Sequence, residues 1–116
     1  MAIDYRESSV RSSEAVIHAG TVYLAAQVAA DPAPPTALEQ TRQVLAQIDD
    51  ALARCGSSKS KLLTATLYST DARYWDDINS LWDAWVPWHD PPACTYIVAK
   101  LATSKQRVAI QVTAGL

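Results

Sequence analysis

The side chains best suited to chemistry gather in one stretch, WDAWVPWHDPPACTY, which runs from Trp82 to Tyr96. Cys94 follows a proline turn there and begins a predicted strand. A thiol adds readily to an iminium or an activated alkene when a nearby cation or helix N-terminus lowers its pKa. Tyr96 lies two residues further on and therefore shares the face of Cys94. Cys94 is thus the candidate catalytic residue, with His89 across the turn as a candidate base.

Each of these residues also has an ordinary structural interpretation. A lone cysteine in a strand is most often a small buried hydrophobic residue, and a lone histidine in a turn is usually just solvated. Trp88, in the same turn, is either the apolar wall of a pocket or a docked part of the core. The sequence leaves these alternatives open.

The tryptophans before the turn belong to a predicted helix over residues 72–86, which Asp71 caps. Its apolar positions are spaced as in a helix that lies on a sheet, and we interpret them as core. They are Tyr74, Trp75, Ile78, Trp82 and Trp85.

A longer predicted helix comes earlier in the chain. Thr36 and Glu39 form a capping-box pattern at its start, and Gly56 ends it where a left-handed residue is needed. Its apolar stripe consists of Leu38, Leu45, Ile48 and Leu52. Just before this helix, residues 31–35 hold three prolines, which cannot extend a central strand.

The remaining segments predict strands. Residues 3–7 predict a weak one, and residues 14–29 predict two more, joined by a turn at Ala19–Gly20. Residues 61–69 alternate, with Leu63, Ala65 and Leu67 on one face. Residues 93–101 and 107–114 predict the last two strands, and in the second of these Val108, Ile110 and Val112 face the core.

This order of elements predicts an α+β sandwich, in which a six-stranded, mostly antiparallel sheet carries two helices packed on one face. The length of 116 residues fits one domain over residues 1–116. The other face of the sheet is too apolar and too rich in hydroxyl groups to remain simply exposed to solvent, so we expect it to line a subunit interface. Its expected members are Thr64, Thr66, Tyr68 and Tyr96.

Composition narrows the class of function. A formal net charge of −2 gives no electrostatic footprint for nucleic acid or an acidic membrane. No apolar run has the length of a membrane span, and residues 1–13 have no signal-peptide core, so we expect a cytoplasmic protein. Cys55 and Cys94 lie in different elements and show no metal-type spacing, so we expect no disulfide framework and no metal.

Three segments together resemble the Rid family of reactive intermediate deaminases, also called the YjgF or L-PSP family. The first is VIHAGTVYLAAQVA, and the second is EQTRQVLAQIDDALARCGSSKSKLLTATLYSTD. The third is INSLWDAWV, followed later in the chain by PPACT and RVAIQVTA. The resemblance covers residues 10–114. It implies a chorismate-mutase-like fold and a homotrimer with ligand clefts between subunits. The implied chemistry is hydrolysis of a reactive enamine or imine to a keto acid and ammonia, without cofactor or metal.

The chain departs from the family pattern at two positions that carry chemistry. Family members use an arginine at the start of the strand after the second helix to bind the substrate carboxylate, and a glutamate on the last strand to position water. Here the arginine position falls on Cys94, or on Ala93 with one residue of slack, and the glutamate position falls on Ala109. We therefore expect weak or absent activity on 2-aminoacrylate-type substrates.

The expected cleft is neutral, with thiol, phenol and amide groups, and favours an uncharged or aromatic ligand. Beside Cys94, its expected substrate-binding residues are Tyr96, Asn79, Gln111, Ala26, Trp88 and Ala109. Asn79 matches a polar position of the family, and Ala26 lies in a turn where the family has glycine.

Two functions remain open. One is a divergent Rid enzyme that hydrolyses, tautomerises or cyclises a reactive imine, enamine or related nitrogen-containing intermediate, with Cys94 in place of the arginine. The alternative is a non-catalytic trimer that binds a small metabolite and has lost the deaminase chemistry. A ribonuclease ranks third, because the sequence offers no histidine pair for acid–base catalysis and no basic groove.

Overall fold

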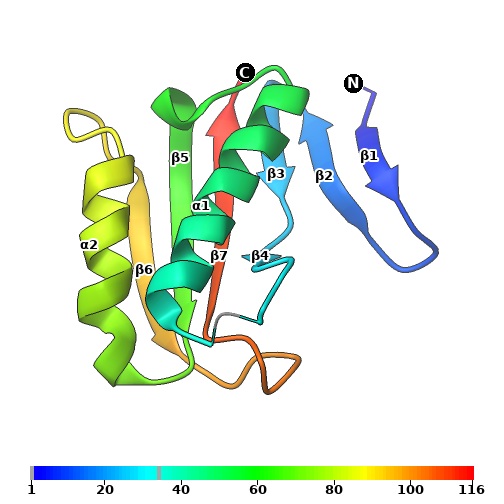
Figure 1. The fold of residues 1–116 in the computed structure, drawn as a ribbon. Helices are drawn as coiled ribbons and strands as arrows, with labels where there is room; N and C mark the ends of the chain where they lie inside the picture. The colour runs from blue at the N-terminus through cyan, green and yellow to red at the C-terminus, as the bar shows by residue number, and fades with distance from the viewer. Residues whose placement is uncertain (1, 34) are drawn as a thin grey trace.

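The computed structural model describes residues 2–33 and 35–116, so one of the three prolines expected to break the early strand pattern, Pro34, lies outside the described residues. A single twisted sheet carries both helices on one face (Figure 1), which confirms the predicted α+β sandwich. The strands are β1 (Asp4–Ser8), β2 (Ser13–His18), β3 (Thr21–Leu24), β4 (Gln27–Val28), β5 (Leu62–Ser69), β6 (Ala93–Val98) and β7 (Val108–Gly115). The helices are α1 (Ala37–Arg54) and α2 (Trp75–Trp85), and single 3-10 turns cover Lys59–Lys61 and Ala72–Tyr74.

The strand order of the sheet is β1-β2-β3-β7-β5-β6, and β4 also pairs with β7. All pairs are antiparallel except β5–β6, which is parallel because the chain crosses over through α2 between these two strands. The prediction of six strands was one short. The segment expected to hold two strands is interrupted at Ala25 and Ala26, and the chain then rejoins the sheet as the two-residue β4.

Local sequence signals set the ends of the first helix and the first tight hairpin as predicted. The Thr36 hydroxyl accepts a hydrogen bond from the backbone N–H of Glu39 at 3.2 Å. Gly56 follows α1 with φ +78°, and the backbone N–H of Ser57 reaches back to the carbonyl of Leu52, as in a Schellman motif. The turn at Ala19–Gly20 has positive φ at both positions, which matches the twist of a two-residue hairpin.

One predicted orientation in β5 was wrong. Leu63 was expected to face the core, but it is 49% exposed, whereas Leu62 is 7% exposed and belongs to the core. The register with β7 shifts between Leu62 and Thr64, so an irregularity there reverses the alternation for one residue. From Ala65 onward the predicted faces are correct.

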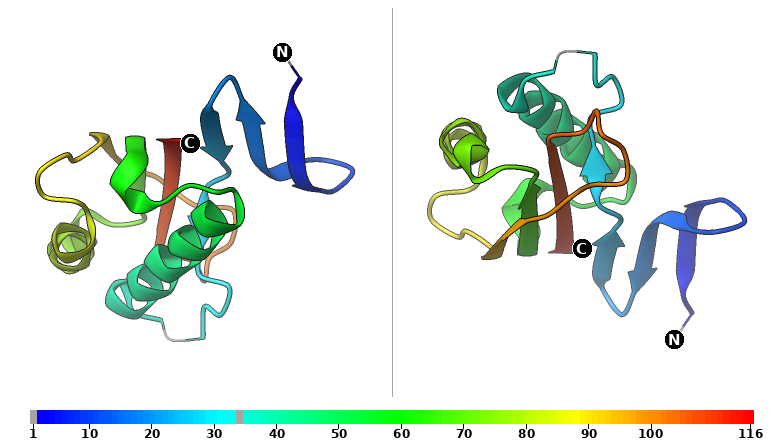
Figure 2. Two further views of the ribbon diagram at one scale, coloured as in Figure 1. Left: turned by 90° about the horizontal axis from the view of Figure 1, so that it is seen from above. Right: turned by 90° about the horizontal axis from the view of Figure 1, so that it is seen from below.

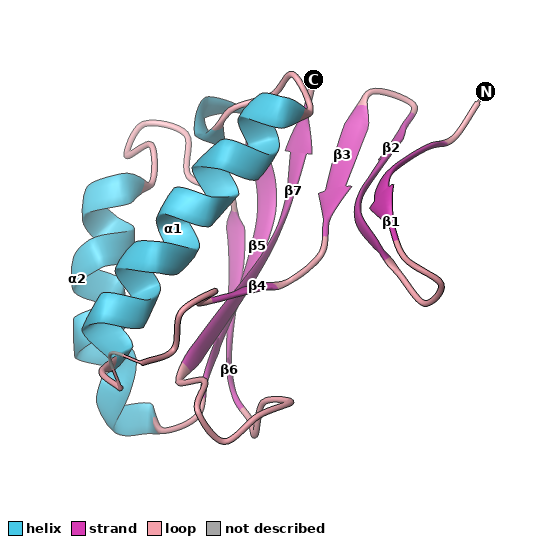
Figure 3. Ribbon diagram, turned by 45° about the vertical axis from the view of Figure 1, so that its right-hand side comes forward, coloured by secondary structure: helices cyan, strands magenta, loops and turns pink. Residues whose placement is uncertain are grey.

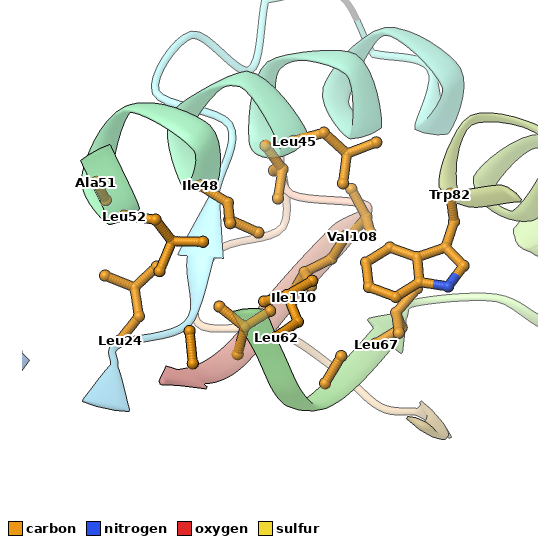
Figure 4. Packing of buried hydrophobic residues seen from close by; sticks show 14 of the residues in the cluster. Leu24, Leu45, Ile48, Ala51, Leu52, Leu62, Leu67, Trp82, Val108 and Ile110 are labelled. Atoms are coloured by element: carbon orange, nitrogen blue, oxygen red, sulfur yellow. The ribbon is translucent and has the colours of Figure 1, made fainter. Parts of the chain in front are cut away.

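The core lies between the two helices and the sheet. Leu45 and Ile48 of α1 point toward Val108 and Ile110 of β7, and the indole of Trp82 lies near Leu67 (Figure 4). Ile78 and Trp82 are fully or nearly buried, and Tyr74, Trp75 and Trp85 pack against the core while partly exposed. The interpretation of these aromatic residues as core is therefore confirmed.

A row of glutamines on α1 ties two irregular segments to the helix. Gln40 accepts a hydrogen bond from the Arg107 N–H at 2.7 Å and donates one to the Lys105 carbonyl at 3.0 Å. Gln43 makes the same pair of bonds to the N–H and carbonyl of Asp31. Gln47 bonds the backbone of residues 28 and 30. Side chains thus satisfy backbone groups that no strand pairs.

The β1–β2 hairpin extends beyond the layer of helices (Figures 2 and 3). Arg54, in the last turn of α1, bridges to it through Glu7 and Glu14. The Arg54 guanidinium holds the pKa of Glu14 below its usual value. This ion-pair cluster fixes the projecting hairpin against the end of α1.

Candidate functional site

The pairing of β6 decides which way its side chains point. Ala65 pairs with Cys94 and Leu67 pairs with Tyr96 in the parallel ladder. Ala65 and Leu67 are 1% and 0% exposed and face the helices. Residues opposite each other in a sheet share a face, so Cys94 and Tyr96 lie on the helix side of the sheet, next to α2.

This placement corrects two expectations. Tyr96 was expected on the face of the sheet that the helices leave open, but that face receives Ala93 and Thr95 from β6. Gln111 and Ala109 of the last strand were expected in one cleft with Cys94, but β5 lies between β6 and β7. The physical reason is the crossover through α2, which adds β6 as a parallel strand on the outer side of β5.

The residues predicted to form one pocket therefore fall into separate groups. Cys94, Tyr96 and Asn79 lie on the helix side, between β6 and α2. Ala109 and Gln111 lie on the open face, at register positions opposite Tyr68 and Thr66. Within one subunit the structure does not bring these two groups into a single cavity.

The helix-side group, here called the α2–β6 cluster, consists of Trp75, Asn79, Asp83, Cys94 and Tyr96. The rings of Trp75 and Tyr96 meet edge to face, with centroids 5.2 Å apart and an interplanar angle of 88°. Burial raises the pKa of Tyr96, and the nearby Cys94 and Asp83 add to this effect. The phenol is therefore a neutral hydrogen-bond donor at neutral pH.

Asn79 contributes an acceptor without a partner to this cluster. It lies one helical turn after Trp75 and one turn before Asp83. Trp75 meets Tyr96 and Asp83 acts on it, so helix geometry places Asn79 on the stripe of α2 that faces β6. Its Oδ1 atom is buried and has no hydrogen-bond partner within residues 2–33 and 35–116. A buried acceptor in this state is rare in proteins and is stabilised by any donor that reaches it.

Cys94 is exposed, so its sulfur does not lie deep beneath the helices. Partial burial raises the pKa of its thiol, and no cation contributes in the opposite direction. His89, the candidate base, stacks on Trp88 with ring centroids 3.6 Å apart. Trp88 is 80% exposed and lies in the loop between α2 and β6. The aromatic wall of the α2–β6 cluster is therefore Trp75.

The open-face group centres on the interruption between β3 and β4. The Gln111 side chain donates to the carbonyl of Leu24 at 3.0 Å, at the point where β3 ends. Ala26 is exposed in the following loop, and Ala109 lies opposite Val28 of β4 and is 4% exposed. Here Gln111 satisfies a backbone carbonyl at the point where the pairing of β3 with β7 is interrupted.

Two members of the α2–β6 cluster were missed as site residues. Trp75 was assigned only to the core, and Asp83 was not considered. Their spacing of four residues on either side of Asn79 could have indicated a shared helix face. What the sequence did not show was that β6 would place Tyr96 against this face.

Within the described ranges, no three histidine, cysteine, aspartate or glutamate side chains gather closely enough to hold a metal ion. No helix in the same part of the chain combines the length and hydropathy that crossing a bilayer requires.

Comparison with known proteins gives consistent matches along the chain. A family model described as Endoribonuclease L-PSP matches residues 5–116. A RutC family protein from Haemophilus influenzae is 40% identical over 106 residues, which cover 91% of this chain and 91% of that protein. The RutC family protein YoaB of Escherichia coli is 37% identical and covers 100% of both chains.

A solved structure extends the comparison to three dimensions. The crystal structure of a YjgF family member from Neisseria meningitidis is 42% identical and superposes with a TM-score of 0.94, covering 99% of this chain and 95% of that one. The fold and these matches define a YjgF-type α+β protein. The chain therefore belongs to the Rid family, also called YjgF or L-PSP.

Proposed function

We propose that the protein hydrolyses an uncharged reactive imine, or the enamine in equilibrium with it, in a cleft between subunits of a homotrimer. The ligand site is the α2–β6 cluster. The observation that carries this proposal is the buried Oδ1 of Asn79 without a partner. An imine or enamine N–H is a donor that satisfies it, while Trp75 and Tyr96 supply an apolar wall.

The charge of the cluster argues for an uncharged substrate. Its members include no arginine or lysine, and its one ionised group is the carboxylate of Asp83. A 2-imino acid would place its own carboxylate beside Asp83 without a cation to bind it, which is unfavourable. A neutral imine avoids this repulsion.

Cys94 can act here without a lowered pKa. As the sulfur bonds to the imine carbon, the thiol proton moves to the imine nitrogen, giving a neutral thioaminal. Water then replaces the sulfur and returns the proton to the thiol, and the resulting carbinolamine releases ammonia to leave a carbonyl compound. The net reaction consumes one water and needs no cofactor.

The open face of the sheet supports an oligomer. Tyr23, Val28 and Ile97 are apolar and between 37% and 48% exposed on or beside this face. Thr64 and Thr113 hydrogen-bond to each other across it. A second subunit that covers this surface would bury apolar area and so stabilise an oligomer.

The test compares two classes of imine generated in place. An amine oxidase yields a neutral imine, and an amino-acid oxidase yields a 2-imino acid. We expect faster release of ammonia from the neutral imine only. Cys94→Ala should lower this rate by about 10² or more, and Asn79→Leu should weaken substrate binding. Faster release of ammonia from the 2-imino acid alone would overturn the proposal. Full activity of Cys94→Ala would overturn the role of the thiol.

The raised pKa of Cys94 supports a second candidate, a trimer that binds the same neutral ligand without turnover. Alkylation and turnover together separate the two candidates. Both expect the exposed Cys94 to react before the buried Cys55, but more slowly than free cysteine at neutral pH, and both expect a stable imine analogue to protect it. Only the binding function expects this protection while no imine is consumed.

A further inference from the structure

The segment between β6 and β7, residues 99–107, is held in place from two sides. The side chain of Gln40, which is fully buried, bonds to the backbone of Lys105 and Arg107. Directly after β5, the backbone N–H of Thr70 donates to the Arg107 carbonyl at 3.0 Å. The segment is therefore fixed by hydrogen bonds to both neighbouring elements.

This segment and Thr70 line an open cavity of about 330 Å³, which shares no residue with the α2–β6 cluster. Its polar lining includes Lys100, Thr103, Ser104, Gln106 and Arg107. A second cavity shares Ser104 and Arg107 and adds Lys105. Together the two cavities are large enough for a small organic ligand.

The cations of this region carry no counter-ion. Lys100, Lys105 and Arg107 form no ion pair within the part of the chain that the structure describes, although the protein is acidic overall. Four other arginines are each paired with a carboxylate; they are Arg6, Arg42, Arg54 and Arg73. The Arg107 guanidinium is oriented by a 2.8 Å bond to the Ser104 carbonyl. The one carboxylate at the second cavity, Asp31, accepts from the Ala33 N–H instead.

Gln106 adds a second, independent indication of a ligand. It is 9% exposed, and its Nε2 donates to the Ala29 carbonyl at 3.3 Å, which fixes Oε1 as the acceptor end of the amide. This Oε1 is buried and has no partner among the described residues. Gln106 thus carries an unpaired acceptor and lines the same cavity as Lys100 and Arg107.

We propose that this cavity binds a small anion that also carries an O–H or N–H group. Arg107 and Lys100 bind the anionic end, because a guanidinium pairs with carboxylate or phosphate through parallel hydrogen bonds. The O–H or N–H group donates to Oε1 of Gln106. Both 2-hydroxy carboxylates and hydrogen phosphate have this chemistry.

The test uses two carboxylates of similar size, lactate and propionate, of which only lactate carries a hydroxyl group. Each is titrated into the full chain while the backbone amide signals of residues 99–107 are followed by NMR. We expect lactate to bind about tenfold more tightly than propionate, because only lactate satisfies the buried acceptor. A titration with inorganic phosphate distinguishes the two ligand classes. Tighter binding of phosphate than of lactate indicates a phosphate ligand, and weaker binding indicates a hydroxy acid.

Variants separate charge from specific contact. Arg107→Gln should abolish binding of both carboxylates, and Gln106→Leu should remove the preference for lactate. Arg11→Gln removes the same charge from the exposed turn between β1 and β2 and should change nothing. Equal binding of lactate and propionate to the unmodified protein, absence of binding, or an equal loss in Arg11→Gln would each overturn the proposal. The comparison of lactate with propionate on the unmodified protein tests the proposal even if Gln106→Leu does not fold.

Discussion

Replacement of Gln40 by methionine tests how strongly a side chain can hold a loop. Gln40 is fully buried, and its amide satisfies the Arg107 N–H at 2.7 Å and the Lys105 carbonyl at 3.0 Å. Methionine has nearly the same length and volume, so the substitution removes these hydrogen bonds without opening a large cavity.

The expected loss follows from the groups left behind. A buried backbone group without a partner costs about 1–3 kcal/mol. Two such groups give about 2–6 kcal/mol, and both lie only partly buried, which favours the lower half of this range. The apolar methionine regains about 1 kcal/mol by burial. We therefore expect Gln40→Met to lower the free energy of unfolding by about 1–3 kcal/mol.

Gln43 provides a matched control on the same helix. It makes the same two bonds, to the N–H and carbonyl of Asp31 at 3.1 and 2.8 Å, but at an exposed site. Water can replace both bonds there, so Gln43→Met should cost less than about 1 kcal/mol. Urea unfolding with an unchanged m-value measures both losses, and hydrogen exchange at the Arg107 amide reports the local effect. Equal losses in the two variants would refute the reasoning.

Two further predictions concern charge and packing. Arg54 lowers the folded-state pKa of Glu14, so the stabilisation is present above the ordinary carboxyl pKa and is lost as the pH falls through the folded value. The fall in stability on acidification should therefore be steeper in the unmodified protein than in Glu14→Gln, which should flatten it below about pH 5; parallel pH profiles would contradict this. Trp82, 3% exposed, should cost about 3–5 kcal/mol when replaced by alanine, whereas Trp88, 80% exposed, should cost less than about 0.5 kcal/mol; thermal unfolding of both variants checks the contrast, and similar losses would contradict the burial argument.

The fold was predictable because its signals are local. Thr36 and Gly56 mark the ends of α1, the turn at Ala19–Gly20 joins two strands, and alternation identifies β7. The errors came from interruptions that alternation does not reveal. Leu63 follows an irregular step in the register, and the break at Ala25 creates a separate short strand.

The candidate site was predictable only in part, because its geometry depends on pairing between distant strands. Cys94 and Tyr96 were correctly placed on one face of β6. Which face this is depends on the register with β5, and a shift of one residue would have reversed it. Asn79 was chosen by resemblance, and the structure adds that its Oδ1 lacks a partner. The role of Trp75 beside Tyr96 required the packing of α2 on the sheet.

The position of β7 has a consequence for synthesis. This strand follows every other element in the sequence, yet it lies between β3 and β5 and pairs with both. A nascent chain that has passed β6 therefore holds two parts of a sheet that share no ladder, one from β1 to β3 and one from β5 to β6. Until β7 is available, the apolar face of α1 has no complete surface to cover, so folding waits for the strand that joins the two parts.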